Sequence, residues 1–190
     1  DGVSNSITVP ASASLNVSNF TIESWINPSN ASQQMPIAEY AAPTGPAGVH
    51  LWISVYNAGT LFANVRTSDD NSREISSTAG LIVSNQWNHV ALTFDAATGS
   101  ATLYLNGAAV ATAVWGAFTP KTGLPLLIGY RPAGSFDGEA NAHFAGKIDE
   151  LSLYNRALSA TEIQSIYNAN SSGKCGSPTP PTPPTPPTTN

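Results

Sequence analysis

The stretch Phe144–Asn170 constrains the fold more than any other part of this chain of 190 residues. Residues 148–154 are rich in β-forming residues, and residues 158–167 change to the spacing of a helix with one apolar face. Ser159, followed three residues later by Glu162, is the pattern of a capping box, in which both side chains satisfy backbone N–H groups of the first helical turn. The sequence therefore predicts an acidic strand followed by one short helix.

Apolar and polar residues alternate in several other segments, which predicts β-strands. The alternation is clearest in residues 20–26 and 49–55. Further strands are expected near residues 60–67, 73–77, 88–94, 100–106, 108–113, 125–130 and 144–155. The dipeptide Asn106-Gly107 favours a type I′ hairpin turn, because both residues of that turn adopt positive φ. Many short strands and one late helix predict an all-β, antiparallel jelly-roll β-sandwich with a short C-terminal helix.

Four blocks of the sequence resemble the bacterial laminin-G-like domains of the concanavalin A-like lectin and glucanase superfamily. The last block, residues 144–163, is close to the family pattern F-x-G-x-I-D-E followed by Y-N-R-A-L-S and E-I. The earlier blocks, residues 1–10, 20–26 and 87–107, follow in the family's order. The resemblance covers roughly residues 1–170 and implies a scaffold that hosts enzymes, lectins and adhesive modules alike.

Charge and hydropathy narrow the range of partners. The chain has 7 Lys and Arg against 12 Asp and Glu, so its net charge is −5, and charged residues make up 10% of it. This composition lacks the basic surface of a protein that binds nucleic acid or anionic membranes. No apolar run approaches the roughly 20 residues that a membrane helix needs. We therefore expect neither nucleic acid binding nor membrane insertion.

The composition changes to Ser, Gly, Pro and Thr from residue 171 onward. The run 178–188 favours polyproline II and would reach on the order of 34 Å at about 3.1 Å per residue. We expect residues 1–170 to form one domain and residues 171–190 to form a linker. The alternative is an assembly element that docks into another copy through Pro178, Pro180, Pro181, Pro183 and Pro184. The tail, the scarcity of lysine and the family resemblance together favour an extracellular or cell-surface bacterial protein.

The acidic residues do not form the catalytic pattern of glucanases on this scaffold. Those enzymes carry E-x-D-x-x-E or E-x-D-x-E on one strand, because a retaining glycosidase needs two carboxyl groups roughly 5 Å apart. The nearest match is K-I-D-E-L at residues 147–151, where a lysine replaces the first glutamate. His50, His89 and His143 fit neither a metal-ligand spacing nor a nucleophile motif. We therefore expect no enzymatic activity, and a structural role for His89.

Asp149 is the residue for which the family resemblance implies a metal. In similar domains the aspartate of I-D-E and the opening D-G meet around one calcium ion, which prefers hard oxygen ligands. By that resemblance Asp149 would supply a carboxylate, and Gly2 and Asp1 would supply carbonyl or carboxylate oxygens. A structural Ca²⁺ would then tie the first strand to a late one. The alternative is that Asp149 and Glu150 bond only to the backbone or to Arg156.

Aromatic residues on one face of the strand at residues 49–55 predict a sugar-binding groove. A pyranose ring stacks on an aromatic side chain while polar neighbours orient its hydroxyl groups. The alternation places the apolar residues of this strand on one face and its aromatic and histidine residues on the other. The predicted ligand site comprises Trp52, Tyr56, His50, Arg66, Tyr130 and Arg131. By contrast, Trp25 and Trp87 lie in blocks that define the fold, and we expect them in the core.

The sequence therefore predicts a non-catalytic, extracellular binding or adhesion module that binds a glycan or a cell-surface polymer and is stabilised by calcium. The alternative is a self-assembling structural subunit of an extracellular fibre, held to other copies of itself by its terminal segments. An open groove around Trp52 would favour the first hypothesis, and a tail buried against another copy would favour the second.

Overall fold

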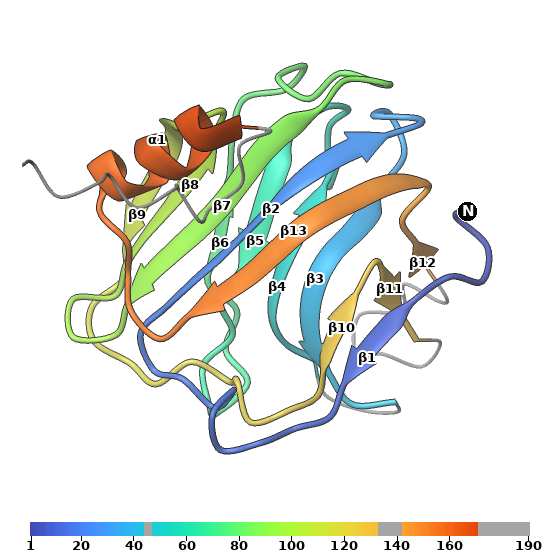
Figure 1. The fold of residues 1–190 in the computed structure, drawn as a ribbon. Helices are drawn as coiled ribbons and strands as arrows, with labels where there is room; N and C mark the ends of the chain where they lie inside the picture. The colour runs from blue at the N-terminus through green and yellow to red at the C-terminus, as the bar shows by residue number, and fades with distance from the viewer. Residues whose placement is uncertain (44–46, 133–141, 171–190) are drawn as a thin grey trace, which may run out of the picture.

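The computed structural model describes residues 1–43, 47–132 and 142–170, which form two antiparallel sheets packed face to face (Figure 1). One sheet has the strand order β1 (Ile7–Val9), β10 (Leu126–Ile128), β3 (Met35–Ala41), β4 (Ala47–Ile53), β5 (Leu61–Asn64) and β6 (Glu74–Ser76). The other has the order β13 (Gly146–Tyr154), β2 (Phe20–Pro28), β7 (Asn88–Asp95), β8 (Ser100–Leu105) and β9 (Ala108–Val114). The predicted all-β jelly-roll sandwich is confirmed.

Two small elements lie outside these sheets. The short strands β11 (Tyr130–Arg131) and β12 (Ala142–His143) pair with each other and contact β3. Helix α1 (Ala160–Ala169) lies on the outer face of the five-stranded sheet, in front of the sandwich in Figure 1. The predicted tail, with Pro178, Pro180, Pro181, Pro183 and Pro184, and the single cysteine Cys175 lie outside the described residues.

The core between the sheets follows from the alternation along the strands. Ile22 and Ile26 of β2 are fully buried, as are Leu51 and Ile53 of β4, and all four belong to one apolar cluster. Burying a side chain of this size contributes about 1.5–3 kcal/mol relative to leaving it exposed. The alternate residues of each strand point to the opposite, outer face of their sheet. Those outer faces carry the candidate functional residues.

Strand β3 is the longest of the strands that the alternation does not reveal. All of its residues are buried, because it lies between β10 and β4 with the core on one face and the pair β11–β12 against it. A strand that is covered on both faces loses the alternation of buried and exposed residues, and β3 does so although it contains Glu39. Pro36 also argues against a strand in the sequence, but in the structure it lies at a β-bulge, where a sheet tolerates proline.

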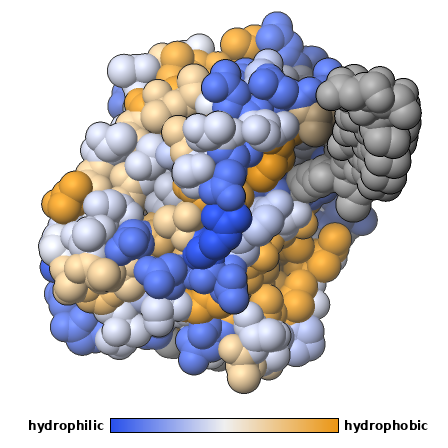
Figure 2. Space-filling view, turned by 60° about the vertical axis from the view of Figure 1, so that its left-hand side comes forward, coloured by the Kyte–Doolittle hydropathy of each residue, from blue (hydrophilic) through white to orange (hydrophobic). Residues whose placement is uncertain are grey.

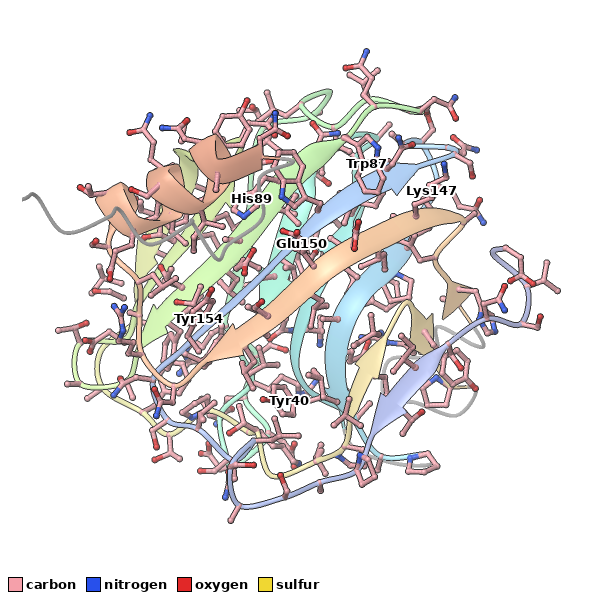
Figure 3. All side chains as sticks on the ribbon, viewed as in Figure 1. Tyr40, Trp87, His89, Lys147, Glu150 and Tyr154 are labelled. Carbon is pink, nitrogen blue, oxygen red and sulfur yellow. The ribbon has the colours of Figure 1, made fainter. Side chains whose placement is uncertain are left out.

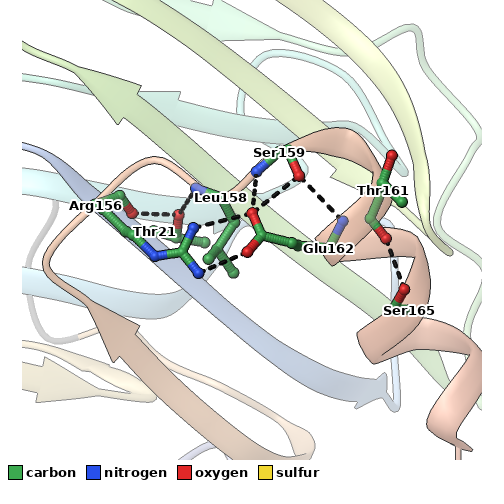
Figure 4. Close-up of polar contacts among 7 residues, drawn as sticks. All are labelled: Thr21, Arg156, Leu158, Ser159, Thr161, Glu162 and Ser165. Atoms are coloured by element: carbon green, nitrogen blue, oxygen red, sulfur yellow. Dashed lines mark hydrogen bonds and ion pairs between the residues drawn. The ribbon is translucent and has the colours of Figure 1, made fainter.

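Helix α1 begins two residues later than the sequence predicts, after the N-cap Ser159. The backbone N–H of Glu162 donates to the Ser159 hydroxyl, and the backbone N–H of Ser159 donates to the Glu162 carboxylate, so the predicted capping box is confirmed (Figure 4). Arg156 donates two hydrogen bonds to the same carboxylate, at 2.9 and 2.6 Å. The contacts with Arg156, and next those with Ser159, lower the pKa of Glu162 to about 2.

Helix α1 is held to the sheet at both ends. Before the helix, Leu158 N–H donates to the Thr21 hydroxyl of β2 at 2.9 Å (Figure 4). Near its end, Tyr167 packs over the predicted hairpin turn between β8 and β9, which is confirmed, with φ of 50° at Asn106 and 79° at Gly107. A Cβ atom at Gly107 would lie 3.0 Å from the Tyr167 ring, so this glycine is required by its φ and by the helix above it.

The side of the molecule that carries β9 and α1 mixes hydrophilic and hydrophobic residues instead of presenting one apolar patch (Figure 2). Among the described residues, no helix has the length and apolar character needed to cross a membrane.

Candidate functional site

The outer face of the six-stranded sheet carries a row of polar side chains that crosses four strands. Glu39 of β3 is paired with His50 of β4, and His50 with Asn64 of β5. Asn64 is paired in turn with Glu74 of β6. Residues directly opposite one another in antiparallel strands point to the same face of a sheet. The fold therefore gathers four polar side chains that the sequence separates.

Glu39 is the centre of a buried charged cluster. Arg131 of β11 donates from Nε to both carboxylate oxygens of Glu39, at 2.9 and 2.8 Å. The indole Nε1 of Trp52 donates to the same carboxylate at 3.0 Å. The guanidinium carbon of Arg131 lies 4.2 Å from the centroid of the Trp52 ring. Removing one partner of a buried ion pair costs on the order of 3–5 kcal/mol, so this cluster holds β11 onto β3.

Trp52 lies on the predicted outer face but is only 1% exposed, so the expectation of an open aromatic platform is wrong. Val55 and Phe62 pack around it, and Ala142 of β12 adjoins the same cluster. The guanidinium of Arg131 covers the ring. Trp52 therefore belongs to the floor of the site, and its ring does not offer a stacking surface for a sugar.

A cavity of about 560 Å³ opens beside this cluster, over β4, β5 and β6 and the loop that follows β4. Its lining combines aromatic and polar side chains, among them His50, Trp52, Tyr56, Phe62, Asn64, Glu74 and Arg131. Pockets of roughly 300–1,000 Å³ with a few convergent polar groups hold small ligands in proteins. We call this space the sheet cavity. It brings together four of the six predicted ligand residues: His50, Trp52, Tyr56 and Arg131.

Arg66 and Tyr130, the other two predicted ligand residues, do not line the sheet cavity. Arg66 is buried, and its Nη2 donates to the backbone oxygen of Asp70 at 2.8 Å. The Tyr130 ring stacks on His143, with 4.6 Å between the ring centroids. In their place the cavity uses Asn64, Glu74 and Phe62. The strand register reveals these three, because Asn64 is opposite His50 and Glu74, and Phe62 is opposite Trp52.

Tyr56 is the exposed aromatic side chain of the sheet cavity. It is 73% exposed, and its hydroxyl donates to Glu74 at 2.9 Å. That hydrogen bond raises the pKa of Tyr56. The ring also meets Phe62 edge-on, with 5.7 Å between centroids. Tyr56 has φ of 66°, a left-handed backbone conformation. This conformation costs a residue with a side chain about 1–2 kcal/mol, so other contacts of the loop must stabilise it.

His50 presents a neutral imidazole to the sheet cavity. Burial, and next the positive charge of Arg131, lower the pKa of His50 well below its usual value. Its Nδ1 lies 3.2 Å from the backbone oxygen of Gly48. A neutral ring that donates from Nδ1 to this oxygen keeps Nε2 as a hydrogen-bond acceptor.

The two carboxylates of the polar row do not match a glycosidase. Glu39 and Glu74 lie three strands apart, and strands are spaced by about 4.8 Å, so their backbones are roughly 14 Å apart. Glycosidases place their two carboxyl groups at about 5–9.5 Å. In addition, Glu39 is already bonded to Arg131 and Trp52.

The three predicted calcium ligands do not line a common pocket. Asp1 accepts the backbone N–H groups of residues 3–5 at 3.0 Å and lines a cleft beside Ile148. Gly2, with φ of 73°, packs against Ala145. Asp149 accepts the N–H of Glu150 at 2.8 Å and lines a different pocket. Within the described ranges, no three acidic, histidine or cysteine side chains cluster as a metal site. The calcium site therefore stays a prediction.

The tryptophans expected in the core lie on the outer face of the five-stranded sheet. Trp87 precedes β7 and is 44% exposed, so its expected burial is wrong. Trp25 is half-buried, and it is paired with Asp149 on one side and His89 on the other. His89 is fully buried, with Nε2 3.0 Å from the Glu23 carboxylate.

These observations define a lectin-like β-sandwich with a polar and aromatic cavity on the outer face of one sheet. The family model described as the concanavalin A-like lectin/glucanases superfamily matches residues 1–164, and the chain belongs to this superfamily. A comparison with curated proteins finds no match.

Several solved structures are similar in fold. A carbohydrate-binding module (CBM40) of the Ruminococcus gnavus IT-sialidase, bound to α2,3-sialyllactose, has a TM-score of 0.69 and 19% identity over 88% of this chain and 95% of that one. A putative carbohydrate-binding protein from Bacteroides ovatus has a TM-score of 0.65 and 24% identity over 87% and 46%. A heptameric SAP-like pentraxin from Limulus polyphemus has a TM-score of 0.63 and 21% identity over 86% and 73%. At these identities the likeness shows the fold alone.

Proposed function

We propose that the chain is a non-catalytic glycan-binding module and that the sheet cavity is its ligand site. The observation that carries this proposal is the lining of the cavity, which sets the exposed ring of Tyr56 beside His50, Asn64 and Glu74. Two of the solved structures similar in fold, a carbohydrate-binding module with bound sialyllactose and a putative carbohydrate-binding protein, support a sugar as the ligand.

Each lining group has a role that suits a sugar. The ring of Tyr56 stacks on the apolar C–H face of a pyranose. The carboxylate of Glu74 accepts hydrogen bonds from sugar hydroxyl groups, and the neutral His50 accepts one more through Nε2. Asn64 holds Glu74 through a hydrogen bond of 3.3 Å and adds a side-chain amide to the same wall. The buried pair of Arg131 and Glu39 fixes the floor beneath them.

We infer a binding module rather than an enzyme because the backbones of Glu39 and Glu74 are roughly 14 Å apart and the Glu39 carboxylate is already bonded to Arg131 and Trp52. A module of this kind acts outside the cell, where it attaches a larger protein to a glycan or a cell-surface polymer, and a calcium ion at Asp149 would add stability. The alternative of a fibre subunit depends on the tail, for which the described residues carry no observation.

The proposal is tested by screening the protein on a glycan array and titrating the best ligand by calorimetry. Tyr56→Ala removes the stacking ring and should weaken binding about tenfold, which corresponds to about 1.4 kcal/mol. Glu74→Gln keeps the shape of the side chain but loses a charged acceptor, and should weaken binding severalfold. Trp87→Ala removes an exposed aromatic ring from the opposite sheet and is the matched control, for which we expect unchanged glycan affinity. An array without any ligand for the wild type would reject the proposal.

A further inference from the structure

The hydrogen-bond donors and acceptors of the sheet cavity are used unequally within the protein. This imbalance bears on the kind of sugar that the cavity can bind. A sugar hydroxyl group both donates and accepts a hydrogen bond, whereas a carboxylate or sulfate group only accepts. The groups that the cavity leaves open to a ligand therefore discriminate between neutral and acidic sugars.

The floor of the sheet cavity offers a ligand little positive charge. Arg131 is the one cationic side chain among the described residues that line the cavity. It is 2% exposed, and its Nε donates to both oxygens of the Glu39 carboxylate. The indole Nε1 of Trp52 donates to the same carboxylate. These floor donors are therefore engaged within the protein, and the charge of Arg131 is offset by that of Glu39.

The wall over β5 and β6 is also engaged where it could donate. The side-chain amide of Asn64 donates to the Ser72 hydroxyl at 2.9 Å and to one oxygen of Glu74 at 3.3 Å, which uses both of its N–H groups. The Tyr56 hydroxyl donates to the other oxygen of Glu74 at 2.9 Å. A ligand that needs a donor from Asn64 or Tyr56 would have to break one of these bonds.

Three groups of the same wall can still accept hydrogen bonds. Each oxygen of the Glu74 carboxylate accepts one hydrogen bond, and a carboxylate oxygen can accept two. The Tyr56 oxygen gives its hydrogen to Glu74 and keeps its lone pairs. The neutral ring of His50 donates from Nδ1 to the backbone oxygen of Gly48, so Nε2 is an acceptor. The wall therefore favours a ligand that donates hydrogen bonds.

The charge of Glu74 adds to this preference. Its two hydrogen-bond partners among the described residues, Tyr56 and Asn64, are neutral. The loops before β3 and after β4 add three neutral side chains to the lining, Ser32, Gln34 and Asn57. The internal segments outside the described residues, 44–46 and 133–141, contain no lysine, arginine or histidine in their sequence. An acidic sugar would therefore bring a second negative charge to a wall that already carries one.

On the basis of the proposed glycan site, we propose that the sheet cavity selects glycans without acidic groups. A neutral sugar donates hydroxyl hydrogens to Glu74, Tyr56 and His50 while its apolar face stacks on the Tyr56 ring. A sialic acid, a uronic acid or a sulfated sugar places its negative charge beside Glu74 and is repelled. Like charges brought together in this way exclude wrong ligands as effectively as new contacts favour the right one.

The test uses an array in which each neutral glycan is printed beside its sialylated, sulfated or uronic acid counterpart, with the whole chain applied at low and at high salt. In every pair that binds, we expect the neutral member to bind at least about tenfold more tightly at low salt, which corresponds to about 1.4 kcal/mol. High salt should narrow this difference and leave neutral binding unchanged, because Glu74 is exposed and its repulsion of an anion is screened.

A matched pair of variants locates the selectivity. Glu74→Gln removes the charge and adds N–H donors, so the preference for the neutral member should fall about tenfold. Glu150→Gln makes the same change on the other sheet, where Figure 3 shows Glu150 with Trp87 on the outward side, and it should leave the preference unchanged.

The outcomes separate this selectivity from the proposed function. Acidic glycans that bind the wild type as tightly as their neutral counterparts would overturn the selectivity and leave the glycan-binding module in place. A preference that Glu74→Gln does not change would also overturn it, because the charge of Glu74 would not be its source. An array on which no glycan binds would reject the proposed function, and the selectivity with it.

Discussion

The two outer sheet faces treat the same kinds of residue in opposite ways. On the outer face of the six-stranded sheet, the carboxylate of Glu39 is bonded to a buried arginine, and Trp52 is covered by that arginine. On the outer face of the five-stranded sheet, Asp149 lines an open pocket with Trp25 and Trp87, and Trp87 remains exposed. The difference is the cover, since β11 and β12 close over the first face and helix α1 covers only part of the second. Whether the side chains on an outer sheet face are buried or exposed therefore depends on elements that are distant in the sequence.

The largest expected effect comes from breaking the cover of the sheet cavity. Arg131→Met removes the guanidinium and leaves the buried carboxylate of Glu39 without its cation. We expect a loss of about 3–5 kcal/mol in the free energy of unfolding, measured by urea denaturation. The double variant Arg131→Met, Glu39→Leu replaces the pair by apolar groups and should recover most of this loss. A single variant as stable as the wild type would mean that the pair does not hold β11 to the sheet.

This contrast also explains which parts of the fold the sequence could predict. The capping box at Ser159 and the turn at Asn106-Gly107 were predictable, because each depends on residues close together in the chain. Strand β3 was missed, because burial on both faces removes the alternation by which a strand is read. Local signals therefore identify the elements that begin, end or turn the chain, but not a strand that is covered on both sides.

The candidate site shows the same limit. The alternation placed Trp52 on the correct face, but its burial depends on Arg131, which lies far along the chain. The polar row needs the register of four strands, and no pattern within one strand gives that register. Trp87 was expected in the core because its block defines the fold, yet it precedes β7 and so escapes the alternation of that strand. The sequence could thus predict on which face of a sheet a residue lies. It could not predict which distant segments bury that face.

A second prediction tests the contact between the hairpin turn and helix α1. Gly107 and Gly80 have nearly the same φ, 79° and 77°, but a Cβ atom would meet the Tyr167 ring at Gly107 and nothing within 4 Å at Gly80. Gly80→Ala should cost about 1–2 kcal/mol through its backbone conformation alone. Gly107→Ala should cost more, because its Cβ atom would also displace the Tyr167 ring. Equal losses of stability would show that the contact with Tyr167 adds nothing.

A third prediction concerns calcium. It tests whether the Asp149 carboxylate binds the metal or supports the fold without one. If Asp149 is a metal ligand, Asp149→Ala should lower the melting temperature by a few degrees in calcium and change it little in chelator. Differential scanning fluorimetry in both buffers provides the measurement, with Glu150→Ala as the neighbouring acidic control. An equal shift in both buffers would argue that Asp149 supports the fold without a metal.

The smallest expected effect concerns the stability that Glu162 contributes to helix α1, on the sheet opposite the sheet cavity. Arg156 and Ser159 hold the pKa of Glu162 at about 2, below its ordinary value of 4.5. A carboxylate with a lowered pKa in the folded state contributes stability that is complete above pH 4.5 and is lost as the pH falls toward 2. Glu162→Gln should therefore be less stable than the wild type at neutral pH, and the difference should shrink on acidification. Hydrogen exchange should place the change in helix α1, because Glu162 caps that helix and does not touch the polar row. A difference that stays constant down to pH 2 would show that the capping box does not depend on the charge of Glu162.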